Sequence, residues 1–373
     1  MLIVRLKRVS LTLIRAIRKY CVLLVLLLAQ YIGIAQLDVE HFLPPMTSST
    51  HRFIGNAGAG YQVIYLSTPS ADPINYTIYN GAGAVLYTGS VSNGNPKTHG
   101  GEGAGQMFGL ATPLFVNQAN LNKPLTGRGV RVVSDGPIYC NLRVRSPNNA
   151  QAASITAKGK SALGTVFRLG HIPTPQKASN WGLNSLGSKL ATVGFYASED
   201  NTTITVDLSR VKPVLWGPNA PNTNGPFTIT LNKGETYVMA LRNQDSPNRN
   251  AGAGFCGGLV TSDKPIAVNT GSMGGYASNT WQADYGADQI VPYEEVGTKY
   301  AVVRGASNDN NLEKVMVVAH KNGTEVKVNG TVVKTLNAGQ TYIVHGSKYV
   351  NGSMFIETSV PAYAYQFMMG SSG

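Results

Sequence analysis

A stretch of eight residues that joins a polar turn to an apolar strand occurs three times, and this repeat constrains the fold most strongly. It reads Ser-Asp-Lys-Pro-Ile-Ala-Val-Asn at 262–269, Ser-Asp-Gly-Pro-Ile-Tyr-Cys-Asn at 134–141 and, more loosely, Thr-Ser-Val-Pro-Ala-Tyr-Ala-Tyr at 358–365. Asp and Pro suit the opening positions of a turn, and a proline before the strand removes no ladder hydrogen bond. We therefore predict that each copy is a closing strand that marks the end of one module.

Two further elements repeat between the second and third modules. Residues 197–206 align with 319–328, and each predicts a strand, a tight polar turn and an alternating strand, which we interpret as a β-hairpin. Asn322-Gly323 is the pair that hairpin turns with positive φ favour. Residues 231–238 and 336–343 follow as a strand, a Gly turn and a strand. The repeats predict about four to five strands per module.

The fold class that these patterns predict is all-β, with about three repeated antiparallel modules. The chain holds 42 Gly and 19 Pro but only 13% charged residues, which is typical of many short strands joined by turns. We expect an extended entry segment at 36–60 and modules at 61–150, 151–275 (with its linker) and 276–373. Packed sandwiches are favoured over propeller-like blades, because three blades are few for a propeller. The third module is expected to be cut short at its C-terminus.

Residues 1–35 predict a secretory signal peptide, with an uncleaved anchor as the alternative. Residues 1–20 hold six Lys or Arg and no acid, an apolar run follows at 22–29, and Gly-Ile-Ala closes the segment at 33–35. The apolar run is short for a bilayer span. We therefore expect secretion, Gln36 as the new N-terminus, and no membrane span in the mature chain.

Removal of the predicted signal peptide halves the net positive charge of the chain. The formal charge is +12, and loss of six basic residues leaves 25 Lys and Arg against 19 acids, about +6. The remaining basic residues are scattered, apart from a mild run at Arg128, Arg131, Arg143 and Arg145 that we interpret as a solvated face. A nucleic-acid partner is therefore not expected.

Few residues suggest chemistry. The six His residues are far apart in sequence, and no nucleophile elbow or phosphate-binding loop is present, so we expect no catalytic residues and no enzyme. Asp284, Asp288 and Asp309 lie in acid-containing stretches and are weak candidates for holding Ca²⁺, since solvated loop acids explain them better. Apart from calcium, no cofactor is expected.

Two cysteines and three tryptophans give further candidates. Cys140 and Cys256 remain after removal of the signal peptide and can form a disulfide in an oxidising compartment, or stay as buried, unpaired residues. Trp181, Trp216 and Trp281 lie in or beside Asn- and Gly-rich stretches. They can contact a sugar or protein ligand, or they can fill the core between modules.

Five motifs together give the chain a family resemblance. They are His-Phe-Leu-Pro-Pro at 41–45, Ala-Leu-Gly-Thr-Val-Phe at 162–167, Glu-Asp-Asn-Thr-Thr at 199–203, Ser-Asp-Lys-Pro-Ile-Ala-Val at 262–268 and Asp-Gln-Ile-Val-Pro at 288–292. From about residue 40 onwards the chain resembles the IgGFc-binding-protein N-terminal type of domain, in the forms found in Bacteroidetes gliding-motility-associated or type IX secreted surface proteins. The resemblance implies an extracellular adhesion or recognition module, and it carries no immunoglobulin-contact motif to this chain.

The sequence thus predicts a secreted or cell-surface, non-catalytic adhesion protein built from β repeats. Its expected partners are an extracellular protein or glycan ligand and proteins of the cell envelope. One alternative is a carbohydrate-binding module or a glycan-active enzyme that uses loop carboxylates. The other is a structural component of a bacterial surface assembly.

Overall fold

The computed structural model describes residues 36–47, 61–101, 106–107, 110–111, 114–145, 152–172, 190–242, 254–275, 284–305 and 309–368. The chain divides into two units, Met1–Ala35 and Gln36–Gly373, and only the second contains described residues. The expected signal peptide therefore lies outside the described residues. Strands and short 3-10 helices, with no α-helix, make up the regular structure of the described part, and the predicted all-β fold is confirmed.

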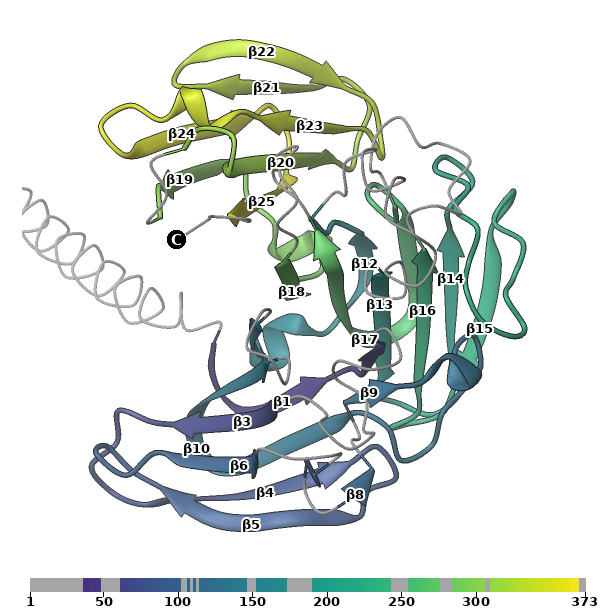
Figure 1. Cartoon of the computed structure of the whole chain (residues 1–373), viewed down its shortest axis with the longest axis vertical. Helices are drawn as coiled ribbons and strands as arrows, with labels where there is room; N and C mark the ends of the chain where they lie inside the picture. The colour runs from purple at the N-terminus through teal and green to yellow at the C-terminus, as the bar shows by residue number, and fades with distance from the viewer. Residues whose placement is uncertain are drawn as a thin grey trace, which may run out of the picture. The chain divides into compact units, whose positions relative to one another are not determined.

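The first group of strands is organised around one long strand that belongs to two sheets (Figure 1). The first half of this strand, β10, pairs with β4 on one edge and with β1 on the other, and the second half pairs with β3 and β11. Since β5 pairs with β4 and β6 with β3, the sheets run β1-β10-β4-β5 and β11-β10-β3-β6. We name this group sandwich 1; its strands are β1 (Leu37–Leu43), β3 (Tyr61–Ser67), β4 (Ile74–Asn80), β5 (Val85–Val91), β6 (Lys97–Gly101), β10 (Val130–Arg145) and β11 (Ala152–Thr156).

Sandwich 2 repeats this topology strand for strand. Its long strand β17 pairs with β14 and β12 in its first half and with β13 and β18 in its second half. The outer pairs are β14 with β15 and β13 with β16. Its strands are β12 (Gly164–Arg168), β13 (Leu190–Ala197), β14 (Thr202–Asp207), β15 (Phe227–Leu231), β16 (Thr236–Arg242), β17 (Leu259–Gly275) and β18 (Asp284–Ile290).

In sandwich 3 the long strand is divided into β24 and β25. One sheet has the order β19-β24-β21-β22 and the other β23-β20-β25, as in the two earlier sandwiches. No described strand occupies the position beside β25 that β11 and β18 fill in the other two. The strands are β19 (Lys299–Val303), β20 (Glu313–Ala319), β21 (Thr324–Val328), β22 (Thr331–Leu336), β23 (Thr341–Val344), β24 (Ser353–Thr358) and β25 (Ala362–Met368).

Short elements complete the described structure. Strand β2 (Met46–Thr47) pairs in parallel with β9 (Phe115–Val116), and β7 (Gln106–Met107) pairs with β8 (Leu110–Ala111). The 3-10 helices are η1 (Gln118–Asn120), η2 (Gly159–Ala162), η5 (Tyr293–Glu295) and η6 (Gly346–Lys348). Helix η2 leads from β11 to β12 and η5 from β18 to β19, so the same kind of connection joins each sandwich to the next.

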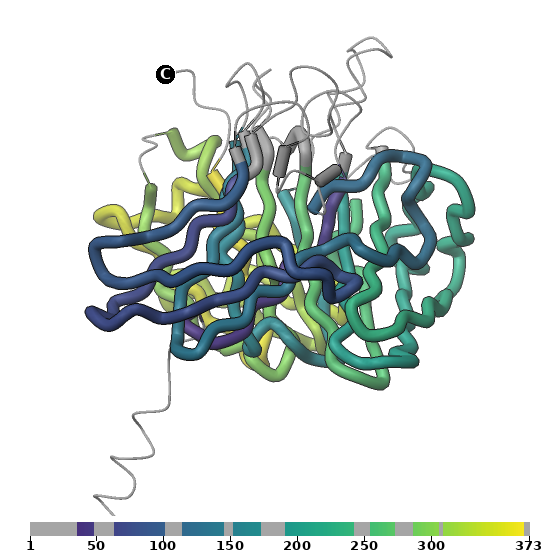
Figure 2. The backbone as a smooth tube through the Cα atoms, turned by 90° about the horizontal axis from the view of Figure 1, so that it is seen from below, coloured from purple at the N-terminus to yellow at the C-terminus, as the bar shows by residue number. Residues whose placement is uncertain are grey.

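Each sandwich has a core of alternating apolar side chains. In β14 and β21, buried and solvent-facing residues alternate along the strand, as expected for strands with one face on a core. One buried cluster belongs to sandwich 1, a second to sandwich 2 and a third to sandwich 3. Trp216, Val238 and Ala240 of sandwich 2 belong to the first cluster, so that core continues into the next sandwich. The tube drawing follows the strands of sandwich 1 in blue and those of sandwich 2 in green (Figure 2).

The repeated Ser-Asp-x-Pro stretch has a different role from the predicted one. In its first two copies it is not a turn before a strand, because residues 134–137 and 262–265 lie inside β10 and β17 where these strands pass from one sheet to the other. Its acid accepts a hydrogen bond from the beginning of a neighbouring strand: Asp135 from Asn75 N (2.8 Å) and Asp263 from Thr203 N (2.7 Å). In the third copy Ser359 Oγ accepts from Glu325 N at 3.0 Å. The stretch therefore fixes the bend of the long strand.

The predicted hairpins at 197–206 and 319–328 are wrong. Strands β13 and β14 lie in different sheets of sandwich 2 and do not pair with each other, and the same holds for β20 and β21 in sandwich 3. Of the pair Asn322-Gly323, only Gly323 has a positive φ (71°). The tight hairpin of sandwich 3 joins β21 to β22 through Asn329 and Gly330, whose φ values are 50° and 82°. An Asn-Gly pair thus marks a tight turn without fixing which strands pair.

Backbone contacts between glycines bring consecutive sandwiches together. A Cβ at Gly81 would lie 2.4 Å from the carbonyl oxygen of Gly234, and a Cβ at Gly257 would lie 2.0 Å from that of Gly339. Gly234 and Gly339 occupy equivalent positions in the aligned strand-turn-strand segments. The same turn of each following sandwich therefore contacts the preceding one, at distances that leave no room for a side chain.

Candidate interaction site

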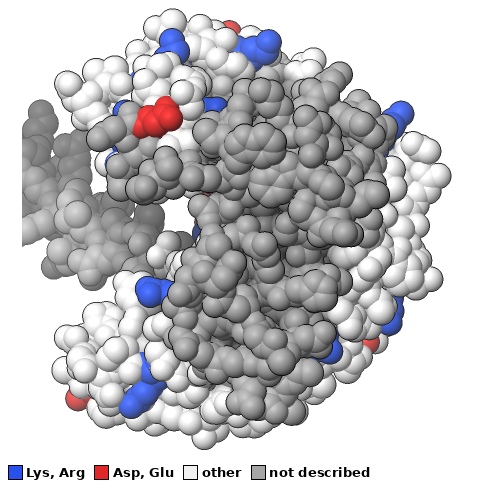
Figure 3. Space-filling model, in the orientation of Figure 1, with Lys and Arg blue, Asp and Glu red and all other residues white. Residues whose placement is uncertain are grey.

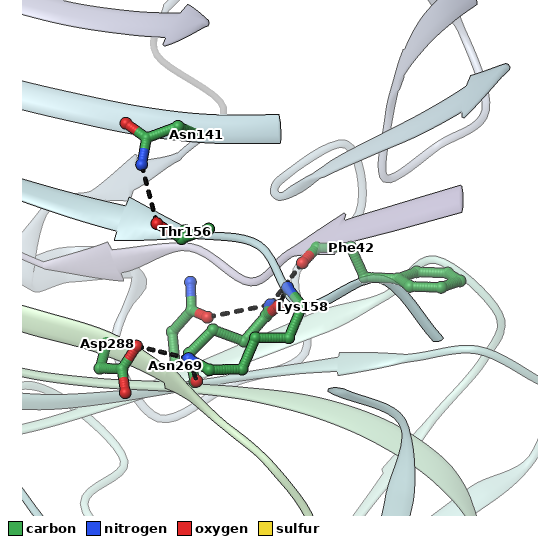
Figure 4. A network of polar contacts seen from close by, with 7 residues as sticks. Phe42, Asn141, Thr156, Lys158, Asn269 and Asp288 are labelled. Atoms are coloured by element: carbon green, nitrogen blue, oxygen red, sulfur yellow. Dashed lines mark hydrogen bonds and ion pairs between the residues drawn. The ribbon is translucent and has the colours of Figure 1, made fainter. Parts of the chain in front are cut away.

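The junction between sandwiches 1 and 2 is built around the buried side chain of Gln289 in β18 (Figure 4). Its Nε2 donates to Phe42 O (2.5 Å) and to Asn269 Oδ1 (3.3 Å), and its Oε1 accepts from Lys158 N (2.7 Å). One amide thereby joins the end of β1, the connection after β11, and β17. Because both polar atoms of this buried amide have partners on other segments, the contact is specific as well as closely packed.

An ion pair and a second amide extend this network. Lys158 Nζ lies 2.6 Å from Asp288 Oδ1, and also donates to Gln289 O. The Asn269 amide donates to Pro44 O at 2.8 Å. Asn141, at the position of sandwich 1 equivalent to Asn269, donates to Thr156 Oγ1 at 3.0 Å (Figure 4). Polar side chains therefore join the long strand to its neighbour in both sandwiches, but only those of sandwich 2 also reach the preceding sandwich.

Tyrosines replace these amides at the junction of sandwiches 2 and 3. Tyr365, which aligns with Asn269, donates from its hydroxyl to Arg168 O (3.1 Å), and Tyr363 donates to Val291 O (2.9 Å). The two rings are stacked, with centroids 5.8 Å apart. A Cβ at Gly170 would lie 2.3 Å from the Tyr365 ring, so the tyrosine requires glycine beneath it. Burial raises the pKa of both hydroxyls, which stay protonated and act as donors.

A cavity of about 360 Å³ lies beside β25 at this second junction. Its walls come from residues 170–172, from β17, from β18 and from the second half of β25. The lining residues that bear on its chemistry are His171, Thr270, Asp288, Tyr365, Gln366 and Met368. The cavity combines an apolar strand, one carboxylate and the edge of a sheet, which suits the binding of an extended polypeptide.

His171 forms part of the cavity wall and is neutral. Its Nδ1 lies 2.8 Å from Ile172 O and its Nε2 lies 3.0 Å from the backbone N–H of Phe255. The carbonyl can only accept and the amide can only donate, so the proton resides on Nδ1. Burial lowers the pKa of the ring to about 4. His171 therefore supplies shape and two fixed hydrogen bonds, with no charge at neutral pH.

The residues proposed for calcium are not brought together. Asp288 is paired with Lys158, while Asp309 Oδ1 accepts from the backbone and the side chain of Asn311 at 2.7 and 3.0 Å. The side chain of Asp284 lies outside the described residues. Within the described ranges, no three His, Cys, Asp or Glu side chains are grouped so that they could hold a metal ion.

Of the candidate ligand-contact tryptophans, only Trp216 is described, and it belongs to the core. Its side chain is 8% exposed in the cluster of sandwich 1 residues, and its backbone N donates to Ala240 O (2.7 Å). Its carbonyl accepts from Asn122 Nδ2 at 2.9 Å. Trp216 therefore fills the space between sandwiches and is not a surface contact. Trp181 and Trp281 lie outside the described residues.

The two cysteines are free thiols in separate clusters. Cys140 lies in the core of sandwich 1, and Cys256 packs with residues of β20 and β25. The disulfide between them is therefore not present in this structure. Burial raises the pKa of each thiol to about 12, so both are protonated and unreactive at neutral pH.

The arginine run makes contacts within its own sheets. Arg131 Nε lies 2.5 Å from Glu40 Oε1 and its guanidinium 5.8 Å from the Tyr79 ring centroid, while Arg143 lies over Tyr65 at 4.6 Å. On the face drawn in Figure 3, the Lys and Arg of the described residues are scattered singly among neutral side chains. The run is thus part of the sheet surface, as the sequence indicates.

Sequence reasoning did not identify Gln289, Lys158, His171 or Tyr365 as important residues. A signal for Gln289 was present, because Asp-Gln-Ile-Val-Pro at 288–292 is one of the motifs that carry the family resemblance. For Lys158 and His171 we find no local signal, since their partners come from distant segments of the chain.

Three consecutive sandwiches of one topology define a β-sandwich repeat protein. The model of the family described as IgGFc binding protein matches residues 152–373, more than half of the chain. The chain therefore belongs to this family, which confirms the resemblance drawn from its motifs. The matched region begins at β11, yet the strands before it form a sandwich of the same topology.

Comparison with solved structures gives distant neighbours. One is titled "Biofilm associated protein - BSP domain", at 8% identity and a TM-score of 0.16, with 92% of this chain and 68% of that chain covered. Another is an α-L-rhamnosidase of Streptomyces avermitilis complexed with L-rhamnose, at 10% identity, a TM-score of 0.16, and 92% and 44% coverage. A comparison with curated protein sequences finds no match. In the described part of the chain, no helix has the length and apolar character needed to cross a bilayer.

Proposed function

We propose that the mature chain is a secreted or cell-surface protein that recognises an extracellular protein and has no catalytic role. Family membership supports a binding function. The predicted signal peptide at residues 1–35 supports export. The cavity beside β25 offers a place for a polypeptide ligand.

The observation that carries the proposal is the repeated, closely fitted junction. Both junctions combine a glycine-to-carbonyl contact with side chains that reach the backbone of the neighbouring sandwich. Such junctions hold the three sandwiches together as one scaffold, because the polar groups that bond across the contact are satisfied only when the sandwiches stay together. A scaffold of this kind suits adhesion, because it keeps the parts of a binding surface in fixed positions.

The proposal is tested by adhesion of beads coated with the full secreted chain. The surfaces carry IgG Fc fragment, mucin or a glycan array, each before and after protease treatment. We expect adhesion to a protein-bearing surface that protease removes, with no release of product from any glycan. Adhesion to protein-free glycans would favour the carbohydrate-binding alternative, and measurable glycan hydrolysis would contradict a non-catalytic role.

A further inference from the structure

Asparagine is followed directly by glycine at six positions, all of them among the described residues. The six are Asn80, Asn93, Asn224, Asn322, Asn329 and Asn351. In such a pair the backbone nitrogen of the glycine can attack the side-chain carbonyl carbon of the asparagine, because glycine has no Cβ to obstruct the approach. A folded chain slows this attack wherever it fixes the side chain. The pairs therefore differ in reactivity according to what each side chain contacts.

Asn80 and Asn322 are held by hydrogen bonds from the backbone. Asn80 Oδ1 accepts from Ala84 N at 3.0 Å, and Asn322 Oδ1 accepts from Ala338 N at 2.9 Å. Gly81, which follows Asn80, is also buried in the contact between sandwiches 1 and 2. In both pairs a hydrogen bond must break before the glycine nitrogen can reach the carbonyl carbon.

Asn329 and Asn351 form a matched comparison within sandwich 3. Each is the first residue of a two-residue turn, and the φ values of asparagine and glycine are 50° and 82° in one turn and 50° and 76° in the other. Asn329 is held twice, since its Oδ1 accepts from Phe355 N at 2.9 Å and its Nδ2 donates to Lys348 O at 2.8 Å. Asn351 is exposed, and its side chain has no hydrogen-bond partner in the described structure. The two pairs therefore differ in the freedom of the amide and hardly at all in φ.

Asn93 and Asn224 also have exposed side chains without a hydrogen-bond partner among the described residues. Asn93 lies in the turn between β5 and β6, and Asn224 lies in the segment that precedes β15. A Cβ built on the glycine that follows either of them would meet no atom within 4 Å. Both pairs therefore have space in which the asparagine side chain can rotate toward the glycine nitrogen.

We propose that Asn93, Asn224 and Asn351 are sites of spontaneous modification, in which water converts the side-chain amide into a carboxylate. The glycine nitrogen bonds to Cγ, the Cγ–Nδ2 bond breaks, and the amide group leaves as ammonia with the proton of the glycine N–H. Water then opens the resulting five-membered imide at either carbonyl, which yields aspartate or isoaspartate. The three held asparagines are protected by their hydrogen bonds. This chemistry needs no partner protein and does not depend on the proposed recognition function.

Modification of Asn351 has a structural consequence. Isoaspartate adds one carbon to the backbone, in a turn where Val350 and Ser353 exchange two hydrogen bonds of 2.8 and 3.0 Å. Strand β24 begins at Ser353 and pairs with both β19 and β21. A longer backbone at this turn displaces the start of a central strand, so sandwich 3 loses stability as the modification accumulates.

The full secreted chain is incubated at pH 8, and each Asn-Gly pair is followed by peptide mapping with mass spectrometry. We expect Asn351 to convert faster than Asn329 by about tenfold or more, because the hydrogen bonds of Asn329 must break first. The pairs at Asn93 and Asn224 should likewise convert faster than the pair at Asn322. The same chain unfolded in guanidinium chloride is the control, and there all six pairs should convert at similar rates. Similar rates in the folded chain, or conversion of Asn329 before Asn351, would overturn the inference.

Two variants test the consequence for sandwich 3. Asn351→Gly removes the reactive amide, and glycine suits the positive φ of this position. The melting temperature of the unaltered chain should fall during incubation, and that of Asn351→Gly should fall much less. Asn224→Gly is the matched control and should lose stability as the unaltered chain does. An equal fall in all three proteins would contradict the role of the turn at Asn351.

Discussion

Gln289 makes the contact that spans the longest sequence separation in the junction network. It bonds to the backbone of Lys158 and of Phe42, which are 131 and 247 positions away. A buried amide with partners on three segments can be satisfied only when those segments are in place together. A local motif can mark such a residue, as the one at 288–292 does, but it cannot identify the distant partners of the amide.

Replacement of Gln289 by leucine should destabilise the chain more than a comparable change in sandwich 1. Gln289→Leu leaves Lys158 N, Phe42 O and Asn269 Oδ1 without this partner, and we expect a loss of about 3 kcal/mol. Thr156→Val removes the single hydrogen bond from Asn141 at the equivalent position and should cost about 1 kcal/mol. Urea unfolding followed by tryptophan fluorescence measures both. Equal losses would show that Gln289 does not hold the junction.

His171 should make the free energy of unfolding decrease as the pH is lowered from its unfolded pKa to its folded pKa. The pKa of its ring is about 4 in the folded chain and 6.5 in the unfolded chain. Above pH 6.5 the ring is neutral in both states and its contribution is fully present. Between pH 6.5 and 4 the unfolded chain binds a proton that the folded chain does not, so stability falls by about 3 kcal/mol.

The measurement compares urea unfolding of the chain and of His171→Gln at pH 7.5, 5.5 and 4. His41, His99 and His320, whose pKa values are also lowered by burial, act in the same direction in both proteins. The difference between the two proteins therefore isolates His171. A difference that stays constant across this range would contradict the assignment.

At the scale of elements, the sequence predicted the strands better than their pairing. The repeats correctly placed strand-turn-strand segments at 197–206 and 319–328, but the strands of each segment belong to opposite sheets. The turn residues indicate that the chain reverses direction, but they do not indicate which sheet the next strand joins. The predicted boundaries also end modules 1 and 2 before β11 and β18. In the structure these two strands pair with β10 and β17, so they belong to sandwiches 1 and 2.

The bend in β17 should depend on a hydrogen-bond acceptor in the side chain at position 263, and not on the negative charge of that side chain. Asp263→Ala removes the acceptor for Thr203 N, and we expect a loss of about 1 kcal/mol, or a melting temperature lower by about 2 °C. Asp263→Ser should retain most of the stability, because Ser359 performs this task in sandwich 3. Differential scanning fluorimetry distinguishes them. A serine variant as unstable as the alanine variant would indicate that the carboxylate is required.

At the scale of the whole molecule, the repeats predicted an array of modules and the structure shows how consecutive modules are joined. The glycines at the junctions are among the 42 of the sequence, and nothing in the sequence distinguishes a contact glycine from a turn glycine. The cavity was not predictable either, because its lining comes from the segment after β12, from β17, from β18 and from β25, which are far apart in the sequence.

Substitution of two glycines with similar backbone conformations distinguishes strain within a turn from steric conflict at a junction. Gly257 and Gly323 have φ values of 89° and 71°, but only Gly257 faces a neighbouring carbonyl, Gly339 O. Gly323→Ala should cost about 1 kcal/mol from its left-handed conformation. Gly257→Ala should cost clearly more, because sandwiches 2 and 3 must also move apart. Thermal unfolding and limited proteolysis between the sandwiches check this, and equal effects would show that the junction tolerates a methyl group.

The divided long strand of sandwich 3 has a mechanical consequence. In sandwiches 1 and 2 the two sheets share one continuous strand, so they cannot part under tension without extracting β10 or β17 from neighbours on both edges. In sandwich 3 the regular strand is interrupted at residues 359–361, and β25 is hydrogen-bonded to β20 alone among the described strands. When the chain is pulled from its ends in an optical trap, sandwich 3 should extend first, at the lowest force. The order in which the three sandwiches extend would therefore depend on whether the long strand that joins their two sheets is continuous.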